Sequence, residues 1–229
     1  MRIAVIPARG GSKRIPRKNV RPFAGKPIVG WSIEAALKSG RFDRVVVSTD
    51  DAEVAQVSAE FGAEVPFVRP AALSDDHTGT GPVVKHAVQE CGLADGDLAC
   101  CLYATAPFVT SGDLERGLEV LEASGAEYAF SATTFPFPIQ RALRVREDGR
   151  VAMFQPEHLE TRSQDLEEAW HDAGQFYWGR ASAWRSGLPL FSEVAAAVPL
   201  PRHQVQDIDT PEDWIRAEVM FRVLQESGA

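Results

Sequence analysis

The chain has 229 residues, of which 45% are hydrophobic and 24% charged. These proportions are ordinary for a globular protein, and the length is sufficient for one domain with a well-buried core. The formal net charge of -8 excludes a general nucleic-acid-binding protein, which would need a basic face. No apolar run approaches the roughly 20 residues of a membrane-spanning helix, and the N-terminus lacks the pattern of a signal peptide, so we expect a cytoplasmic protein that does not enter a membrane.

Strands and helices are expected to alternate along most of the chain. Short apolar runs predict strands at 1–7, 44–49, 98–104, 127–134 and 173–178. Amphipathic patterns with capping residues predict helices at 27–39, 51–61, 80–91, 111–123 (capped near Ser111) and 210–224. The alternation predicts an α/β fold of three layers with a mostly parallel sheet, in a single domain over residues 1–229.

The segment from about 137 to 172 interrupts this alternation. A stretch of alternating polarity at 143–155 contains Asp148-Gly149, a dipeptide typical of hairpin turns. We therefore expect a small hairpin insertion between two strands of the main sheet.

A basic glycine loop follows the first strand directly, at the sheet edge where ligands bind in such folds. Its glycines allow close backbone approach to a phosphate. Arg9, Lys13 and Lys18 have the charge to neutralise a triphosphate and to stabilise a leaving pyrophosphate. The loop is neither a Walker A loop nor a G-x-G-x-x-G loop. Local positive charge in an acidic protein thus predicts an anionic ligand here.

Two aspartates, Asp207 and Asp209, precede the last predicted helix in an Asp-x-Asp pattern. In an extended segment both side chains point to one face. Such a pair beside a triphosphate suits Mg²⁺, which takes one or two carboxylates together with substrate oxygens. For Asp209 the alternative is a simple cap at the N-terminus of the helix.

The motif IPARGGSKRIPRKN, residues 6–19, resembles the signature loop of the CMP-sialic acid synthetase family, and the similarity covers essentially the whole chain. The resemblance implies a Rossmann-like nucleotidyltransferase that uses CTP and Mg²⁺. It further implies a homodimer with the insertion at the subunit interface. It makes Lys18, Arg9, Lys13 and Asp209 the catalytic residues and Asp207 and Asp209, in the D-I-D-T pattern, the metal ligands. It assigns nucleotide and triphosphate contacts to Ala8, Arg9, Gly10, Gly11, Ser12, Lys13, Lys18 and Asn19.

Further positions match the nucleoside and sugar segments of this family. Arg69, followed by a turn that contains Asp75, resembles the segment that holds the cytidine. Tyr103 and Thr105 follow the third buried strand and are expected at the ligand edge. Sialic acid enzymes commonly have a glutamine in place of Tyr103, so this chain departs from them at the acceptor.

The segments CCLY, TRSQDL, HDAG and VQDIDT together resemble the branch of the family that acts on pseudaminic acid. Sialic acid enzymes tend to have an arginine before an Asn-Gly step where this chain has HDAG. The resemblance places His171, Asp172 and Gln175 at the acceptor, with a hydrogen bond to Asp172 as the alternative role of His171. Arg162 is expected to pair with the sugar carboxylate, because a guanidinium matches that geometry, and to do so in the neighbouring subunit's site.

The sequence thus predicts an in-line displacement at the α-phosphate of CTP by the anomeric hydroxyl of an acidic nine-carbon sugar, with release of pyrophosphate. No separate general base is evident. Three alternatives stay open. The first is the same reaction on legionaminic, N-acetylneuraminic or 3-deoxy-octulosonic acid. The others are a glycosyltransferase, which also combines a Rossmann-like sheet with Asp-x-Asp, and a non-catalytic nucleotide-binding module.

Overall fold

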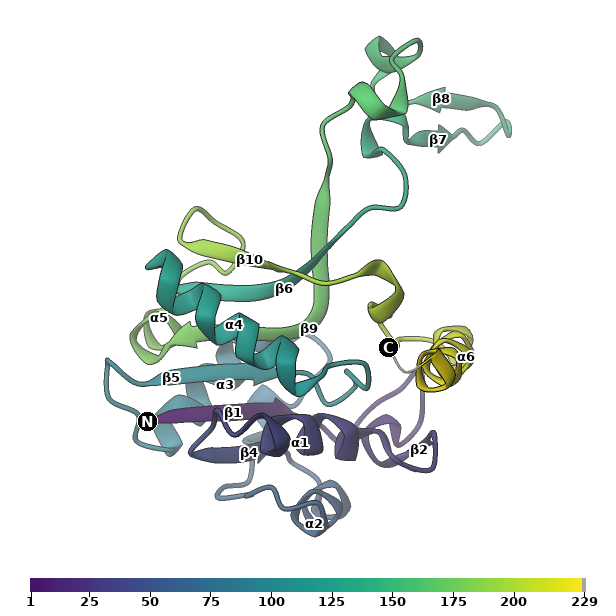
Figure 1. Cartoon of the computed structure of the whole chain (residues 1–229). Coiled ribbons are helices and arrows are strands. Elements are labelled where there is room, and N and C mark those ends of the chain that lie inside the picture. Colours follow the sequence, from purple (N-terminus) through teal and green to yellow (C-terminus); the bar gives the residue numbers. More distant parts are fainter. Residues whose placement is uncertain (228–229) are drawn as a thin grey trace.

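The computed structural model describes residues 1–227, and these contain a central six-stranded sheet (Figure 1). The strand order is β10-β6-β9-β5-β1-β4. All neighbouring pairs are parallel except those of β9, which runs antiparallel to β5 and β6. The prediction of a mostly parallel sheet is therefore confirmed. The strands are β1 (Arg2–Pro7), β4 (Arg44–Ser48), β5 (Leu98–Leu102), β6 (Tyr128–Thr134), β9 (Trp170–Arg180) and β10 (Ala195–Pro199).

Helices cover both faces of the sheet, which gives the predicted three layers. Helices α1 (Ile28–Ser39), α2 (Ala52–Glu60) and α4 (Ser111–Ser124) pack on one face, and α3 (Thr80–Glu90) and α5 (Ala181–Ser186) on the other. Each face has its own apolar core. In β1, Ala4 and Ile6 belong to the core under α1, α2 and α4, while Ile3 and Val5 belong to the core under α3 and α5, because successive side chains of a strand point to opposite faces. Burial on both faces explains why this strand is a continuous apolar run.

A third apolar cluster fastens the C-terminal helix, α6 (Pro211–Ser227), to the segment that follows the basic loop. Phe23 lies in the small ribbon of β2 (Pro22–Phe23) and β3 (Lys26–Pro27), and its ring meets that of Trp214 edge-on at 5.5 Å between centroids. Ile208 is fully buried in the same cluster. This packing positions the neighbours of Ile208, Asp207 and Asp209, against the basic loop.

Helix termini follow local capping chemistry. The Asp51 carboxylate caps α2 by accepting a hydrogen bond from Val54 N at 2.9 Å. The cap of α4 is Thr110 rather than Ser111, because Thr110 and Asp113 form a reciprocal capping box. Sequence analysis also missed α5 and β10, so that the edge strand beyond β6 was not expected.

An arm, residues 135–169, leaves the sheet between β6 and β9 and projects away from the body of the molecule (Figure 1). It contains the predicted hairpin, formed by β7 (Leu143–Val145) and β8 (Val151–Met153). Residues 170–172, expected in the insertion, instead extend β9 and pair with β6. The remaining short helices are η1 (Lys18–Val20), η2 (Ala71–Leu73), η3 (Ile139–Arg141), η4 (Pro156–His158), η5 (Ser163–Asp165) and η6 (Arg202–Gln204).

Among the helices formed by residues 1–227, none has both the length and the apolar character needed to cross a membrane.

Candidate active site

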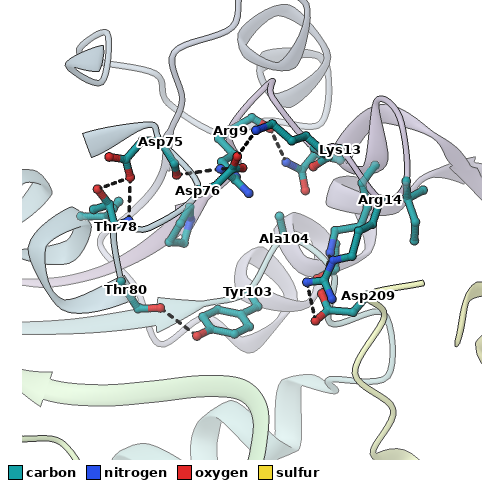
Figure 2. Close-up of a pocket in the computed structure, with 18 of the residues that line it drawn as sticks. Arg9, Lys13, Arg14, Asp75, Asp76, Thr78, Thr80, Tyr103, Ala104 and Asp209 are labelled. Carbon is teal, nitrogen blue, oxygen red and sulfur yellow. Dashed lines mark hydrogen bonds and ion pairs between the residues drawn. The ribbon is translucent and has the colours of Figure 1, made fainter. Parts of the chain in front are cut away.

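A cleft opens at the carboxyl ends of β1 and β5, the expected ligand-binding edge of such a sheet (Figure 2). The basic loop after β1, the segment between α2 and α3, and the turn after β5 provide most of its lining. The segment before α6 adds Asp209. Ten of the predicted site residues line this cleft: Arg9, Ser12, Lys13, Lys18, Asn19, Arg69, Asp75, Tyr103, Thr105 and Asp209.

Backbone contacts fix the basic loop to the sheet. Ala8, which is fully buried, donates its N–H to Ser48 O at 2.9 Å and so continues the contact between β1 and β4 by one residue. The Asn19 side-chain amide donates to Arg9 O at 2.8 Å across the loop. Ala8 and Asn19 therefore hold the loop in shape, and their predicted contacts with the ligand stay predictions.

The two glycines of the loop have different roles. Gly10 N donates to Asp50 Oδ1 at 3.0 Å. A Cβ at Gly10 would lie 2.5 Å from Asp51 Oδ2 and 2.7 Å from Asp51 Cβ, whereas a Cβ at Gly11 would meet nothing within 4 Å. Close packing against Asp51 therefore requires glycine at position 10, while position 11 leaves open space beside the backbone.

Arg9 and Lys13 converge on the carboxylate of Asp76 (Figure 2). Arg9 Nη1 lies 2.7 Å from Asp76 Oδ1, and Lys13 pairs with the other oxygen. Lys13 and then Arg9 hold the pKa of Asp76 below its ordinary value, because both cations favour the ionised carboxylate. Asp75 instead shapes the turn: its Oδ1 accepts from the N–H and hydroxyl of Thr78, and its backbone oxygen accepts from Arg9.

Asp209 is the matching carboxylate on the other side of the cleft. Arg14 Nη2 lies 2.8 Å from its Oδ2, and Lys18 Nζ lies 3.4 Å from its Oδ1. Lys18 also donates to Ile208 O at 2.7 Å. The Asp213 carboxylate accepts from the backbone N–H of Asp209 at 3.2 Å and so helps to fix the segment before α6. On each side of the cleft, two cationic side chains thus form ion pairs with one carboxylate.

Asp207 does not line the cleft, but it is electrostatically coupled to Asp209. The surrounding protein removes water from the Asp207 carboxyl, although part of the residue stays exposed, and this raises its pKa; the Asp209 charge raises it further. Across residues 1–227, no group of three or more His, Cys, Asp or Glu side chains is arranged to hold a metal ion. Two carboxylates fit a Mg²⁺ ion that takes its other ligands from a bound triphosphate and water.

Arg69 is a buried cation with unused hydrogen-bond donors. Its exposed fraction is 4%, and its Nε and Nη2 have no hydrogen-bond partner among the described residues. The Asp50 carboxylate lies 3.7 Å from Nη2, close enough for charge compensation but not for a hydrogen bond. Arg69 lines the cleft, but these two nitrogen atoms are themselves closed to solvent, so their missing acceptors are a free-energy cost of burial within the protein.

A cavity of about 690 Å³ adjoins the cleft, and we call it the side cavity. Tyr103 and Thr80 line both spaces, and their side-chain oxygens lie 2.8 Å apart (Figure 2). Tyr177 donates its hydroxyl to Asp172 Oδ2 at 2.6 Å. Burial raises the pKa of both tyrosines, so their hydroxyls remain donors at neutral pH. Much of the remaining lining is aromatic or apolar: Pro82, Tyr128, Trp184, Leu188, Leu190 and Phe191.

The other predicted acceptor residues line neither space within one chain. Arg162 is exposed in the arm, where it precedes η5. His171 Nδ1 lies 2.9 Å from the backbone oxygen of Asp172, which is the hydrogen bond expected for its alternative role; its contact with the sugar stays a prediction. Gln175 is buried and donates to Gln204 O at 2.6 Å, which ties β9 to the segment before Asp207.

Sequence reasoning missed several polar residues of the site. Asp76 pairs with Arg9 and Lys13, and Arg14 pairs with Asp209. Thr80 lies where the cleft and the side cavity meet. Asp50 and Asp51, which contact Gly10, had a detectable signal: an acidic pair directly after a buried strand at the ligand edge.

Three comparisons place the chain among known proteins. A family model described as cytidylyltransferase matches residues 3–183. A pseudaminic acid cytidylyltransferase of Campylobacter jejuni is 44% identical over 228 residues, which cover 99% of this chain and 98% of the relative. A Helicobacter pylori protein named pseudaminic acid cytidylyltransferase and UDP-2,4-diacetamido-2,4,6-trideoxy-beta-L-altropyranose hydrolase is 37% identical over 207 residues, covering 90% of this chain and 40% of that protein.

A solved structure shares the fold. CMP:2-keto-3-deoxy-manno-octonic acid synthetase complexed with CTP superposes with a TM-score of 0.70 at 20% identity, covering 98% of this chain and 99% of that one. The predicted Rossmann-like nucleotidyltransferase fold is thereby confirmed. The family comprises nucleotidyltransferases that use CTP, which confirms the predicted enzyme class and sets the glycosyltransferase alternative aside. The chain belongs to the cytidylyltransferase family.

Proposed function

We propose that the enzyme transfers CMP from CTP to the anomeric hydroxyl of pseudaminic acid and releases pyrophosphate. One observation carries the proposal: a cation-rich cleft and a largely apolar cavity meet at Tyr103 and Thr80. The cleft suits a nucleoside triphosphate and the cavity an acylated sugar, so the reacting atoms meet where the two spaces join. The 44% identity to a pseudaminic acid cytidylyltransferase supports this acceptor. Because its proposed substrates are CTP and an acid sugar, we place the enzyme in the cytoplasm.

The triphosphate takes the cations of the cleft in this proposal. Its oxygens replace the carboxylates of Asp76 and Asp209 as partners of Arg9, Lys13 and Lys18. These fixed charges stabilise the charge that develops on the leaving pyrophosphate. Arg69, which lines the cleft, contacts the cytidine in this proposal. Catalysis then rests mainly on positioning and electrostatics, which agrees with the absence of an evident general base.

Asp207 and Asp209 are the proposed Mg²⁺ ligands. When bound there, the ion would act as a Lewis acid on the phosphate oxygens. The chain's own contribution is to keep the two carboxylates close enough for the charge of Asp209 to raise the pKa of Asp207. Buried Ile208 anchors the segment between them, and the Asp213 carboxylate receives the Asp209 backbone N–H.

The side cavity is the proposed acceptor site. The printed name of the H. pylori relative couples the cytidylyltransferase with hydrolysis of a diacetamido-trideoxy sugar nucleotide, which supports an acceptor with two acetamido groups. Leu188, Leu190 and Phe191 offer apolar contacts for the methyl groups of such a sugar. A volume of about 690 Å³ lies within the range typical of small-molecule sites, about 300–1,000 Å³.

The arm is the proposed contact with a second subunit. It presents exposed apolar side chains far from the body of its own chain, and such surfaces on a projecting element favour association. Arg162 then lies in the neighbour's acceptor site, where its guanidinium pairs with the sugar carboxylate. The most exposed apolar residues of the arm are Phe137, Leu143, Val145, Val151, Phe154 and Leu159.

The test is pyrophosphate release from CTP and Mg²⁺ with a panel of acid sugars: pseudaminic, N,N'-diacetyllegionaminic, N-acetylneuraminic and 3-deoxy-octulosonic acid. We expect release with pseudaminic acid, and its loss in Asp207→Ala. Glu119→Gln, at an exposed position on α4, is the control and should retain full activity. Release with a different sugar only would keep the reaction and refute the acceptor. CTP binding without release for any sugar would refute the transferase.

A further inference from the structure

A carboxylate is an unexpected group in the side cavity, because most of that lining is aromatic or apolar and the proposed acceptor is itself an anion. Asp172, in β9, is the only acidic residue among the lining residues, and Lys85 is the only cation. Within residues 1–227, Lys85 forms no ion pair with Asp172, so the aspartate charge is not paired off across the cavity.

The Asp172 carboxylate is oriented by two donors from its own strand. Tyr177 donates its hydroxyl to Oδ2 at 2.6 Å, and Gly174 donates its N–H to Oδ1 at 2.9 Å. Gly174 has φ of 63°, a left-handed conformation that favours glycine. An ionised carboxylate offers about four acceptor positions. These two bonds therefore hold the group in place and leave acceptor positions for a ligand.

Asp172 is separated from the cleft by a short series of aromatic side chains. Thr80 and Tyr103 stand at the junction with the cleft. The Tyr103 and Tyr177 rings follow, with centroids 5.4 Å apart, and Tyr177 leads to Asp172. Asp172 lines the side cavity but not the cleft, so it faces the end of an acceptor remote from the reacting phosphate.

We propose that Asp172 is a specificity-determining residue that accepts a hydrogen bond from an acylamino N–H of the acid sugar and turns the sugar's carboxylate end toward the cationic cleft. This inference rests on the proposed function. The acceptor has two chemically different ends, a carboxylate with the anomeric hydroxyl and a chain of acylated amines. A fixed negative charge repels the first and binds donors of the second. The anomeric hydroxyl is thereby presented at the junction with the cleft.

The experiment pairs a change in the enzyme with a change in the sugar. Native enzyme and Asp172→Asn are assayed with CTP and pseudaminic acid, and with two analogues in which one or the other acetamido group is replaced by hydrogen. Tyr177→Phe, which removes one donor that orients Asp172, is the second variant, and Glu119→Gln is the charge-matched control. Melting temperatures show that each variant is folded.

We expect Asp172→Asn to lower kcat/KM for pseudaminic acid by about 10- to 100-fold, because the neutral amide removes the charge from this hydrogen bond and replaces one acceptor oxygen by a donor. The loss should lie in the sugar KM, with the KM for CTP unchanged. With native enzyme, kcat/KM for one of the analogues should be lower than that for pseudaminic acid by a similar factor. For this analogue, Asp172→Asn should lower kcat/KM little further. Tyr177→Phe should show a smaller loss of the same pattern.

Two results would overturn the inference while leaving the proposed function intact. In the first, the loss of kcat/KM caused by Asp172→Asn multiplies with the loss caused by the change of sugar for both analogues. In the second, the KM for CTP and the KM for the sugar rise equally, as a merely structural role would give. Native enzyme that releases no pyrophosphate with any acid sugar would instead refute the proposed function, and this inference with it.

Discussion

Every cation that we assign to the triphosphate already has a carboxylate partner. Arg9 and Lys13 share Asp76, and Lys18 lies beside Asp209. A carboxylate presents the same kind of oxygen as a phosphate does, so these pairs keep the cationic side chains oriented before the ligand arrives. Binding is then an exchange of partners, in which the more highly charged triphosphate displaces a single carboxylate.

The first prediction concerns Asp76→Asn. Removal of the competing charge should tighten CTP binding about 2- to 5-fold, a modest gain because both cations are partly exposed to solvent. Isothermal titration with CTP and Mg²⁺ measures it, and Asp95→Asn, at a highly exposed carboxylate that does not line the cleft, is the control. Weaker binding in Asp76→Asn would show that Asp76 shapes the site more than it competes for it.

The second prediction separates the two glycines of the basic loop. Gly10→Ala would force its Cβ to 2.5 Å from Asp51 Oδ2, so we expect a loss of about 1–3 kcal/mol of unfolding free energy. Gly11→Ala has open space and should leave stability unchanged. Urea denaturation measures both. If Gly11→Ala nevertheless raises the KM for CTP, a phosphate approaches the backbone at that residue; equal stability of the two variants would contradict the packing argument.

At the scale of elements, helix α2 and the basic loop are joined through one side chain. Asp51 caps α2 and also forms an ion pair with Arg17, whose Nη1 lies 2.7 Å from Asp51 Oδ2. Arg17 has φ of 57°, an uncommon conformation for a residue with a side chain, and this pair helps to hold it. The arginine first, and the backbone N–H of Val54 second, lower the pKa of Asp51.

The third prediction follows from the direction of that shift. The lowered pKa means that Asp51 stabilises the fold above its ordinary pKa of 3.8, and that this stabilisation is lost as pH falls through the lower folded-state value. Asp51→Asn keeps a good cap but removes the charge, and should cost about 0.5–1 kcal/mol at pH 7, discounted for the half-exposed arginine. Urea denaturation across pH should show the difference shrink below pH 3.8. A constant difference would mean that the charge contributes nothing.

The elements that sequence reasoning found and missed differ in how local their causes are. The strand at Arg2–Pro7 is an apolar run because both its faces are buried, and helices α2 and α4 carry their own capping residues, so these elements can be predicted from a short window. β10 is AAAVP, a short edge strand whose pairing with β6 comes from a distant segment. Likewise, the loop and the Asp-x-Asp segment were predictable as motifs, whereas the contact of Arg9 with Asp76 depends on where two loops meet in space.

At the scale of the whole molecule, the proposed role of the arm determines how many chains make one site. Arg162 lies in the arm, outside the cleft and the side cavity of its own chain, while the apolar side chains of the arm remain exposed. If two copies associate through their arms, a guanidinium of one chain completes the acceptor site of the other. A two-fold interface uses the same surface on both chains, so both sites would be completed at once.

The fourth prediction tests this arrangement with two inactive variants. Asp207→Asn lacks a proposed metal ligand, and Arg162→Ala lacks the proposed partner of the sugar carboxylate. In a mixed dimer, one site combines the intact Asp207 of one chain with the intact Arg162 of the other. Mixing the variants under subunit exchange should therefore restore activity to about a quarter of the native level, because half of the dimers are mixed and each has one complete site.

The alternative arrangement, with Arg162 in the site of its own chain, gives a different result in the same mixing experiment. If Arg162 acted within its own chain, each chain of a mixed dimer would still lack one essential side chain, and mixing would restore no activity.

A further variant, Phe137→Ser with Val145→Ser, removes two of the most exposed apolar residues of the arm and should shift the protein toward monomers in light scattering. Those monomers should retain CTP binding, since every residue of the cleft comes from one chain, but lose transfer to the sugar. The nucleotide half of the site would then belong to the single chain, and the acceptor half to the pair.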